Sequence, residues 1–341
     1  MKKIIIELYI IGLSTIILPF IIKIILLKKI LLIRFGLVFS EKIGHFALDT
    51  ELFLLKKKEN NKKFIIDIIG KEKITSNNYL LKKWKEKFLI LNLKYLIISA
   101  LKLTKYITRS NEHDSNLFDN SDHRYLLNKY DSSINFNKHE NNYGIKILLK
   151  FGLKLDDKYI CIHNRDSFYN KKYLSVKNWE YHKHRNFSIE SFNKVINYFS
   201  SNNNFIFRVG KEVEEKIKLS DKKIIDYPFN DLKSDFMDLF LIKNCRYYVG
   251  CDSGLSCVAY LFRKPMVLTN FTGFNQIIKN AYKKEIIIFK HFYSLDLNRK
   301  LSLKEIFEMK INDIDSYHDF KKMKIELLEN SQEEIFNACL E

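Results

Sequence analysis

Three short apolar runs in the second half of the chain each end in a small polar cluster, and this repeated pattern constrains the fold more than any other feature. The runs, each with the cluster that follows it, are Tyr159–His163 with Asn164-Arg165-Asp166, Phe205–Phe207 with Arg208-Val209-Gly210, and Arg246–Val249 with Gly250-Cys251-Asp252-Ser253-Gly254. Buried runs that alternate with helix-like segments are typical of a parallel sheet, which binds ligands at the carboxyl ends of its strands. We therefore expect the functional residues to lie where these runs end.

Length and composition exclude several classes of protein. A chain of 341 residues is long enough for two domains, and a hydrophobic content of 46% with 14% aromatic residues excludes wholesale disorder. The net charge of +18 would suggest a nucleic-acid partner, but the lysines are spread along the whole chain, and we expect no nucleic acid. The five cysteines form no CxxC pair, which fits a reducing compartment better than a disulfide scaffold or a zinc site.

Arginine is scarce in this lysine-rich chain, so the position of each arginine is informative. Only nine of the 58 basic residues are arginine, and Arg165, Arg185 and Arg208 fall within one strand-loop-helix-strand stretch. A guanidinium can bind phosphate or carboxylate through two parallel hydrogen bonds, which lysine cannot do. The alternative is that these arginines form ordinary surface ion pairs.

Residues 4–27 are the most hydrophobic part of the sequence. Their longest uncharged run, from Leu8 to Ile22, has 15 residues, fewer than the roughly 18 to 20 that span a bilayer. We consider three alternatives: a helix that spans or lies on a membrane, a buried core helix, and a cleaved signal peptide without a typical cleavage site. If the segment spans, Lys23, Lys28 and Lys29 place the rest of the chain on the cytoplasmic face.

Apolar periodicity predicts the order of the elements. The first half predicts strands at 29–35 and 64–69, a turn at Gly36, and helices at 41–57 and 79–88, whereas 91–103 is ambiguous between helix and strand. Residues 109–142 are polar and form either a substrate loop and linker or an insert without function. We expect domain boundaries at 1–28, 29–142 and 143–341.

The second domain alternates regularly between the two kinds of element. The predicted strands are 159–163, 204–208, 223–226, 246–250 and 265–269, and the predicted helices are 143–151, 188–200, 211–219, 234–243, 254–262, 302–310 and 320–339. This alternation predicts a doubly wound α/β domain.

The turn Asp252-Ser253-Gly254 precedes a predicted helix and is a candidate anion site. Free backbone N–H groups at the helix start, together with the Ser253 hydroxyl, favour phosphate. The sequence is neither a Walker motif nor GxGxxG.

Other candidates follow the neighbouring strands. His163, Arg165 and Asp166 end the first strand, although His163 is also explained by packing. Arg208 and Lys211 supply cations at the next strand end. Tyr227 follows a further strand, where its ring either stacks on a nucleobase or packs internally. Arg185 and Asn186 follow His182 and His184, an HxH pair without a third ligand at usable spacing, so we expect no metal.

Gly44 and His45 follow the first predicted strand. A histidine at this position is a candidate general base for an acceptor hydroxyl, because its ordinary pKa lies near neutrality. A histidine without a catalytic role explains the sequence equally well.

The segment from Tyr159 to Phe271 resembles a bacterial glycosyltransferase family of the GT-B type. The resemblance rests on the ordered motifs CIHNRDS, HRNFSIESF, FRVG, IIDYPF, SDFMDLFL and CDSGL, and on KIGHFALDTELFL in the first half. More distantly, the strand end at His163 is similar to the nucleotide-binding half of fucosyltransferases.

The resemblance implies an α/β, GT-B-like fold with two Rossmann-like domains facing across a cleft. Residues 143–341 would bind the nucleotide-sugar donor, with Arg165 and Arg208 on the diphosphate and Asp252, Ser253 and Gly254 on phosphate or ribose. Residues 29–142 would bind a glycan or lipid-linked acceptor, with His45 facing it, and no cofactor or metal would be needed. Two alternatives remain: a nucleotide-sugar epimerase, and a non-catalytic protein that binds anionic glycan or nucleic acid.

Overall fold

The computed structural model describes residues 2–59, 64–117, 121–122, 124–173, 179–274 and 282–341. The chain forms two compact units, unit 1 at Met1–Ser121 and unit 2 at Asp122–Glu341, and each is described by itself. The boundary between them falls inside the polar stretch 109–142 that we expected to contain the linker.

Unit 1 contains a three-stranded parallel sheet with helices on both sides. Its elements are α1 (Lys2–Leu27), β1 (Leu32–Val38), the π-helix η1 (His45–Asp49), α2 (Thr50–Glu59), β2 (Ile65–Lys71), α3 (Asn78–Lys85), β3 (Leu89–Leu91) and α4 (Lys94–Thr108). The strand order is β1-β2-β3. The ambiguous stretch 91–103 is mostly helical, because α4 places Ile97, Ala100 and Thr104 on one buried face.

The predicted turn at Gly36 is wrong. Gly36 lies inside β1 and pairs with Ile69 of β2. A Cβ at this position would stand 1.9 Å from Ser115 Oγ. The absence of a side chain therefore lets the segment around Asp114 pair with Phe35 along the other edge of β1.

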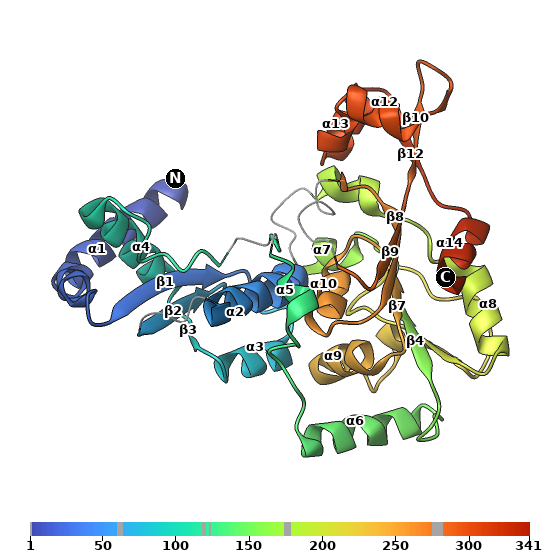
Figure 1. The fold of residues 1–341 in the computed structure, drawn as a ribbon, viewed down its shortest axis with the longest axis horizontal. Helices are drawn as coiled ribbons and strands as arrows, with labels where there is room; N and C mark the ends of the chain where they lie inside the picture. The colour runs from blue at the N-terminus through green and yellow to red at the C-terminus, as the bar shows by residue number, and fades with distance from the viewer. Residues whose placement is uncertain (1, 60–63, 118–120, 123, 174–178, 275–281) are drawn as a thin grey trace. The chain divides into compact units, whose positions relative to one another are not determined.

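The two faces of the unit 1 sheet are covered by different helices (Figure 1). On one face, α1 and α4 pack on Phe35 and Ile68 of the strands. On the other, the Arg34 guanidinium lies 5.6 Å from the ring centroid of Phe53 in α2, and it also pairs with Asp67. Successive strand residues point to opposite faces, so each face has its own apolar layer.

Unit 2 is an α/β domain with a small second sheet. Its first elements are α5 (Leu126–Lys129), α6 (Lys138–Lys150), β4 (Tyr159–Ile162), α7 (Phe168–Tyr173), η2 (Glu180–Arg185), η3 (Ile189–Phe192), α8 (Asn193–Ser201), β5 (Phe205–Arg208), β6 (Ile224–Asp226) and η4 (Tyr227–Phe229). The remaining elements are α9 (Asp235–Asn244), β7 (Tyr248–Gly250), α10 (Gly254–Leu261), β8 (Met266–Phe271), β9 (Glu285–Phe289), β10 (His291–Ser294), β11 (Arg299–Lys300), α12 (Leu303–Glu308), η5 (Ile311–Asp313), α13 (Tyr317–Lys322), β12 (Ile325–Leu328) and α14 (Gln332–Leu340).

The main sheet of unit 2 has the strand order β6-β5-β4-β7-β8-β9, and every pairing is parallel. In chain order this is 3-2-1-4-5-6, the doubly wound arrangement of dinucleotide-binding domains. The order reverses between β4 and β7, and the carboxyl ends of these two strands flank the switch point where such sheets bind ligands. The five strands predicted from the sequence all belong to this sheet, in which β9 is the sixth.

The helix predicted at 211–219 is wrong. Side chains occupy backbone groups that a helix would need: Asp166 Oδ2 accepts from the N–H of Glu214 at 2.9 Å, and Asp226 Oδ2 accepts from that of Ile217 at 2.8 Å. The segment therefore follows an irregular path.

The single helix predicted at 320–339 is also wrong, because β12 interrupts it. Residues of β12 pair antiparallel with β10, from His291 opposite Leu328 to Ser294 opposite Ile325. Lys324, just before the strand, has a φ of 53° and ends the preceding helical segment. Sheet pairing over these four residues thus overrides an apolar spacing that also suits a helix.

Candidate functional site

The loops after β4 and β7 meet at the switch point. Ile162 pairs with Val249, and the His163 N–H donates to the Val249 carbonyl at 2.9 Å. The two polar clusters identified in the sequence, 163–166 and 250–254, therefore begin side by side. This part of unit 2 is the candidate functional site.

Arg165 is half-buried in this site and is held at one end of its guanidinium. Its Nη1 donates to the His182 carbonyl at 3.0 Å and to Asn186 Oδ1 at 2.5 Å. Within the described part of the chain, its Nε and Nη2 make no hydrogen bond, which leaves donors for a ligand. Burial, reinforced by the Arg185 charge, lowers the pKa of Arg165 to about 10. An anion bound here would therefore stabilise the positive charge of Arg165, which burial and Arg185 disfavour.

Arg185 fixes the loop after β7 to the end of η2. Its Nη2 donates to Asp252 Oδ1 at 2.9 Å and to the Asp252 carbonyl at 2.8 Å. The Asp252 carboxylate thus orients an arginine, and both residues are largely buried. The ion pair between Asp252 and Arg185 thus holds one side of the site in place.

Lys290 is a third cation of this site, and the sequence analysis missed it. It follows β9, is only 5% exposed, and donates through Nζ to the Asn186 carbonyl at 2.7 Å. Burial lowers the pKa of this amine. The missed signal is the run Glu285–Phe289, a further apolar strand that ends in a basic residue.

Asn186 connects the cations of the site. It accepts from Arg165 and, through its backbone carbonyl, from Lys290, and its Nδ2 donates to Ser167 Oγ at 2.7 Å. Asn186 therefore helps to set the positions of two cations that lie far apart in the sequence.

The turn at 252–254 begins α10, as the sequence predicts. Ser253 is the N-cap with extended backbone, and Ser256 Oγ donates to the Ser253 carbonyl at 2.6 Å. Both serines are buried. The free N–H groups and positive end of α10 are thus located on the β7 side of the switch point.

His163 and Asp166 hold the loops of the site in place through hydrogen bonds to backbone groups. The His163 Nδ1–H donates to the Val209 carbonyl at 2.9 Å, and burial lowers the pKa of His163 to about 4. The Asp166 carboxylate accepts from the N–H groups of Phe168 and Glu214. His163 is therefore neutral at pH 7, and Asp166 holds the loops after β4 and β5 together.

Arg208 and Tyr227 lie inside the domain. Arg208 has no exposed surface, donates through Nη2 to Asn164 Oδ1 at 2.9 Å and through Nη1 to the Glu215 carbonyl, and lies 3.5 Å from Asp226 Oδ1. The Tyr227 ring is also fully buried, and its hydroxyl donates to the Ser234 carbonyl. These contacts favour a positioning role for Arg208 and the packing alternative for Tyr227. Lys211, partly exposed, pairs with Asp235 at 3.1 Å.

In unit 1, His45 forms a pair with an aspartate that the sequence analysis did not identify. His45 Nδ1 lies 2.9 Å from Asp49 Oδ2, and the imidazole is 39% exposed whereas Asp49 is buried. The preceding Gly44 has helical backbone and begins η1, a five-residue π-helix of a kind that often marks functional sites. The missed signal is the spacing of four residues between His45 and Asp49 on a predicted helix.

Among the described residues, no group of three or more histidine, cysteine, aspartate or glutamate side chains is arranged to hold a metal ion. His182 and His184 have ring centroids 6.4 Å apart. The His184 ring packs on Phe320, 5.4 Å away, and burial lowers the pKa of His184 to about 4.

Comparison with known proteins supports the fold. No family model and no curated protein sequence matches the chain. Among solved structures, the chain is similar to a glycosyl transferase of family 9 from Veillonella parvula DSM 2008, with 12% identity, 90% of this chain and 96% of that chain covered, and a TM-score of 0.50. It is also similar to the E. coli ADP-heptose lps heptosyltransferase II, with 12% identity, 75% and 90% covered, and a TM-score of 0.40.

The match over 90% of the chain confirms the α/β, GT-B-like fold class that the sequence resemblance implied. The apolar N-terminal helix that we expected is also present as α1. At this level of identity the comparison defines the fold alone.

Proposed function

We propose that the protein is a glycosyltransferase that moves a sugar from a nucleotide-sugar donor to a glycan or lipid-linked acceptor. The observation that carries this proposal is the cation cluster at the switch point of unit 2. Arg165 has unused donors, Lys290 and Arg185 are held beside it, and the start of α10 adds backbone N–H groups. Such a cluster suits the diphosphate of a nucleotide sugar.

The same groups would serve the reaction without a metal. When the bond between the sugar and the diphosphate breaks, negative charge develops on the departing diphosphate. Arg165, Lys290 and the N–H groups in the first turn of α10 would stabilise that charge. Arg208, through Asn164, and Arg185, through Asp252, would keep the two loops in place.

His45 of unit 1 is the proposed general base. Its Nε2 would take the proton of the acceptor hydroxyl as that oxygen bonds to the anomeric carbon. Asp49 would accept a hydrogen bond from the Nδ1–H of His45 and so favour the tautomer whose Nε2 is unprotonated. The same carboxylate would stabilise the imidazolium that forms when Nε2 takes the proton. In this proposal, unit 1 serves the acceptor and unit 2 the donor.

Surface polysaccharide or glycan synthesis is the process that we propose. Its acceptors are often carried on lipid, and α1 is long and apolar enough to associate with a membrane by length and composition. We place the protein at the cytoplasmic face of the membrane, because Lys23, Lys28 and Lys29 follow the apolar segment and the anionic cytoplasmic leaflet attracts such cations.

Calorimetric titration with UDP, GDP, ADP, CDP and CMP tests the donor site. We expect one diphosphate to bind, and Arg165→Ala and Lys290→Ala to weaken its binding by about tenfold or more, because each removes one cation contact. The control is Lys218→Ala, which removes an exposed lysine paired with Glu190. Absence of binding to every nucleotide, or binding that both variants leave intact, contradicts the proposal.

Product analysis with a panel of nucleotide sugars separates the activities. Release of the nucleoside diphosphate with transfer or hydrolysis of the sugar supports a glycosyltransferase. Conversion of the donor alone into an isomeric nucleotide sugar would instead identify an epimerase.

A further inference from the structure

We infer that α1 lies along the surface of an anionic membrane, buried in one leaflet, and does not cross the bilayer. This inference rests on the membrane association proposed above and adds how α1 is oriented in the membrane. The partner is a bilayer with anionic head groups. Four observations on unit 1 carry it: the burial pattern of α1, its alignment with α4, the lysines of α4, and the charge around the two helices.

The burial pattern divides α1 into two sides. One stripe packs on the unit: Ile10 and Ile21 are buried, and Ile17 joins the cluster formed with Phe35 and Ile97. The remaining surface exposes large apolar side chains along the whole helix: Ile4, Ile5, Leu8, Tyr9, Ile11, Ile16, Leu18, Phe20, Ile22, Leu26 and Leu27. One side of α1 is therefore buried against protein, and the rest of its surface is apolar and exposed, which suits contact with lipid.

Contacts near both ends show that α1 and α4 run in the same direction, side by side. Near the start, the Tyr9 and Tyr95 rings meet edge to face at 5.8 Å, and Ser99 Oγ donates to the Ile10 carbonyl at 3.1 Å. Just beyond the end of α1, Lys28 Nζ donates to Glu112 Oε1 at 2.8 Å. The helix is therefore attached to its unit near both ends.

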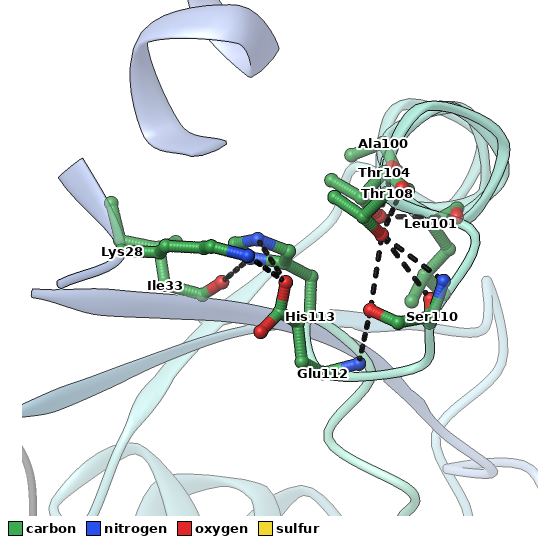
Figure 2. A network of polar contacts seen from close by, with 9 residues as sticks. All are labelled: Lys28, Ile33, Ala100, Leu101, Thr104, Thr108, Ser110, Glu112 and His113. Carbon is green, nitrogen blue, oxygen red and sulfur yellow. Dashed lines mark hydrogen bonds and ion pairs between the residues drawn. The ribbon is translucent and has the colours of Figure 1, made fainter. Parts of the chain in front are cut away.

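A polar network strengthens the second attachment (Figure 2). The Glu112 N–H donates to Ser110 Oγ, which lies 3.1 Å from Thr108 Oγ1 in the last turn of α4. The neighbouring His113 bonds through Nδ1 to the Ile33 carbonyl of β1 at 2.6 Å. The end of α1, the end of α4 and the start of β1 are thus tied together.

This alignment opposes a transmembrane position. If α1 crossed the bilayer while docked, the second half of α4 would enter the hydrocarbon with the exposed Lys102 and Lys105, and a lysine costs roughly 2.5 to 3.5 kcal/mol near the bilayer centre. If α1 left α4 instead, Ile97 and Ala100 would lose their apolar cover. A position in the plane of the membrane avoids both costs.

The charge around the two helices favours anionic lipid. Exposed cations lie on the two helices or just beyond their ends: Lys3, Lys23, Lys29, Lys102, Lys105 and Arg109. The acids near these helices include Glu7, Glu112 and Glu72, of which Glu112 is paired with Lys28 and Glu72 with Lys94 of α4. Each cation near an anionic surface contributes about 1 kcal/mol, and salt screens this attraction.

Vesicle flotation of the full-length protein tests the partner. We expect binding to vesicles of phosphatidylcholine mixed with phosphatidylglycerol to exceed binding to phosphatidylcholine alone at least tenfold, and to fall with salt. The double substitution Ile16→Glu with Phe20→Glu should reduce binding at least tenfold. Leu155→Glu, which places the same charge at an exposed apolar position of unit 2, is the matched control. Equal binding to both vesicles, no binding, or equal loss in the control overturns the inference.

Labelling from outside the vesicles tests the geometry. Lys3→Cys and Lys29→Cys, made separately, should both react with a membrane-impermeant maleimide, with the unsubstituted protein as background. Protection of either position until detergent is added would mean that α1 crosses the bilayer and would overturn the inference. Nucleotide titration of the same variants tests the donor site separately from the membrane position of α1. If only the membrane inference is wrong, donor binding stays unchanged.

Discussion

At the scale of single residues, Arg165 combines two properties that fit a ligand-binding group. One end of its guanidinium is held by Asn186, and the other has donors without a partner among the described residues. Replacement by lysine keeps the charge but removes the planar fork. We therefore expect Arg165→Lys to weaken binding of the nucleoside diphosphate by about tenfold, or about 1.4 kcal/mol, in calorimetry. Arg246→Lys, at an exposed arginine outside the site, should leave the affinity unchanged.

Asp49 provides a test of the proposed base. Asp49→Asn keeps the size of the side chain but can hold the wrong histidine tautomer, so turnover should fall by about tenfold or more. Binding of the donor should not change, because the donor site belongs to unit 2. The measurement is single-turnover transfer beside nucleotide titration; unchanged turnover would show that His45 acts without Asp49 or does not act at all.

His163 makes stability depend on pH. Its pKa is about 4 in the folded protein against an ordinary value of 6.5, so the unfolded chain binds the proton more tightly. Its contribution is fully present above pH 6.5 and is lost as the pH falls toward 4, by about 3 kcal/mol. Urea unfolding between pH 7 and pH 4.5 should show the loss, and His163→Asn should reduce the slope. An unchanged slope would assign the dependence to other groups, such as His184.

At the scale of elements, the packing of α6 on α9 depends on a glycine. A Cβ at Gly144 would stand 2.3 Å from the Phe240 ring. Alanine favours a helix by about 1 kcal/mol over glycine, but the forced displacement of a buried ring costs about 1 to 3 kcal/mol. Gly144→Ala should therefore lower the melting temperature. Gly12→Ala in α1, where a Cβ meets nothing within 4 Å, should leave it equal or higher.

At the scale of the whole molecule, unit 2 has a core of its own. Two large apolar clusters among its described residues contain only residues from Ile160 onward. We expect residues 122–341, produced alone, to unfold cooperatively in urea and to bind the same nucleoside diphosphate as the full chain. A fragment that folds but fails to bind would show that unit 1 contributes to the donor site.

The sequence predicts the doubly wound sheet well, because its buried strands are short apolar runs whose spacing has few other interpretations. It predicts the loops at 163–166 and 252–254 for the same reason. Lys290 was missed because only the fold brings it near its partner Asn186. Asp49 was missed although its spacing of four residues from His45 on a predicted helix is visible in the sequence. The irregular path at 211–219 was missed because Asp166 and Asp226, distant in sequence, compete for its backbone N–H groups.

The strand order of unit 2 also determines when the site can form during synthesis. The first strand of unit 2 to leave the ribosome, β4, is a central strand of the main sheet, and β5 and β6 extend that sheet on one side only. Until β7 emerges, the other edge of β4, with Ile160 and Ile162, has no neighbour and is open to wrong pairing. We therefore expect nascent chains stalled before residue 248 to need chaperone protection, and chains stalled well after residue 271 to need less.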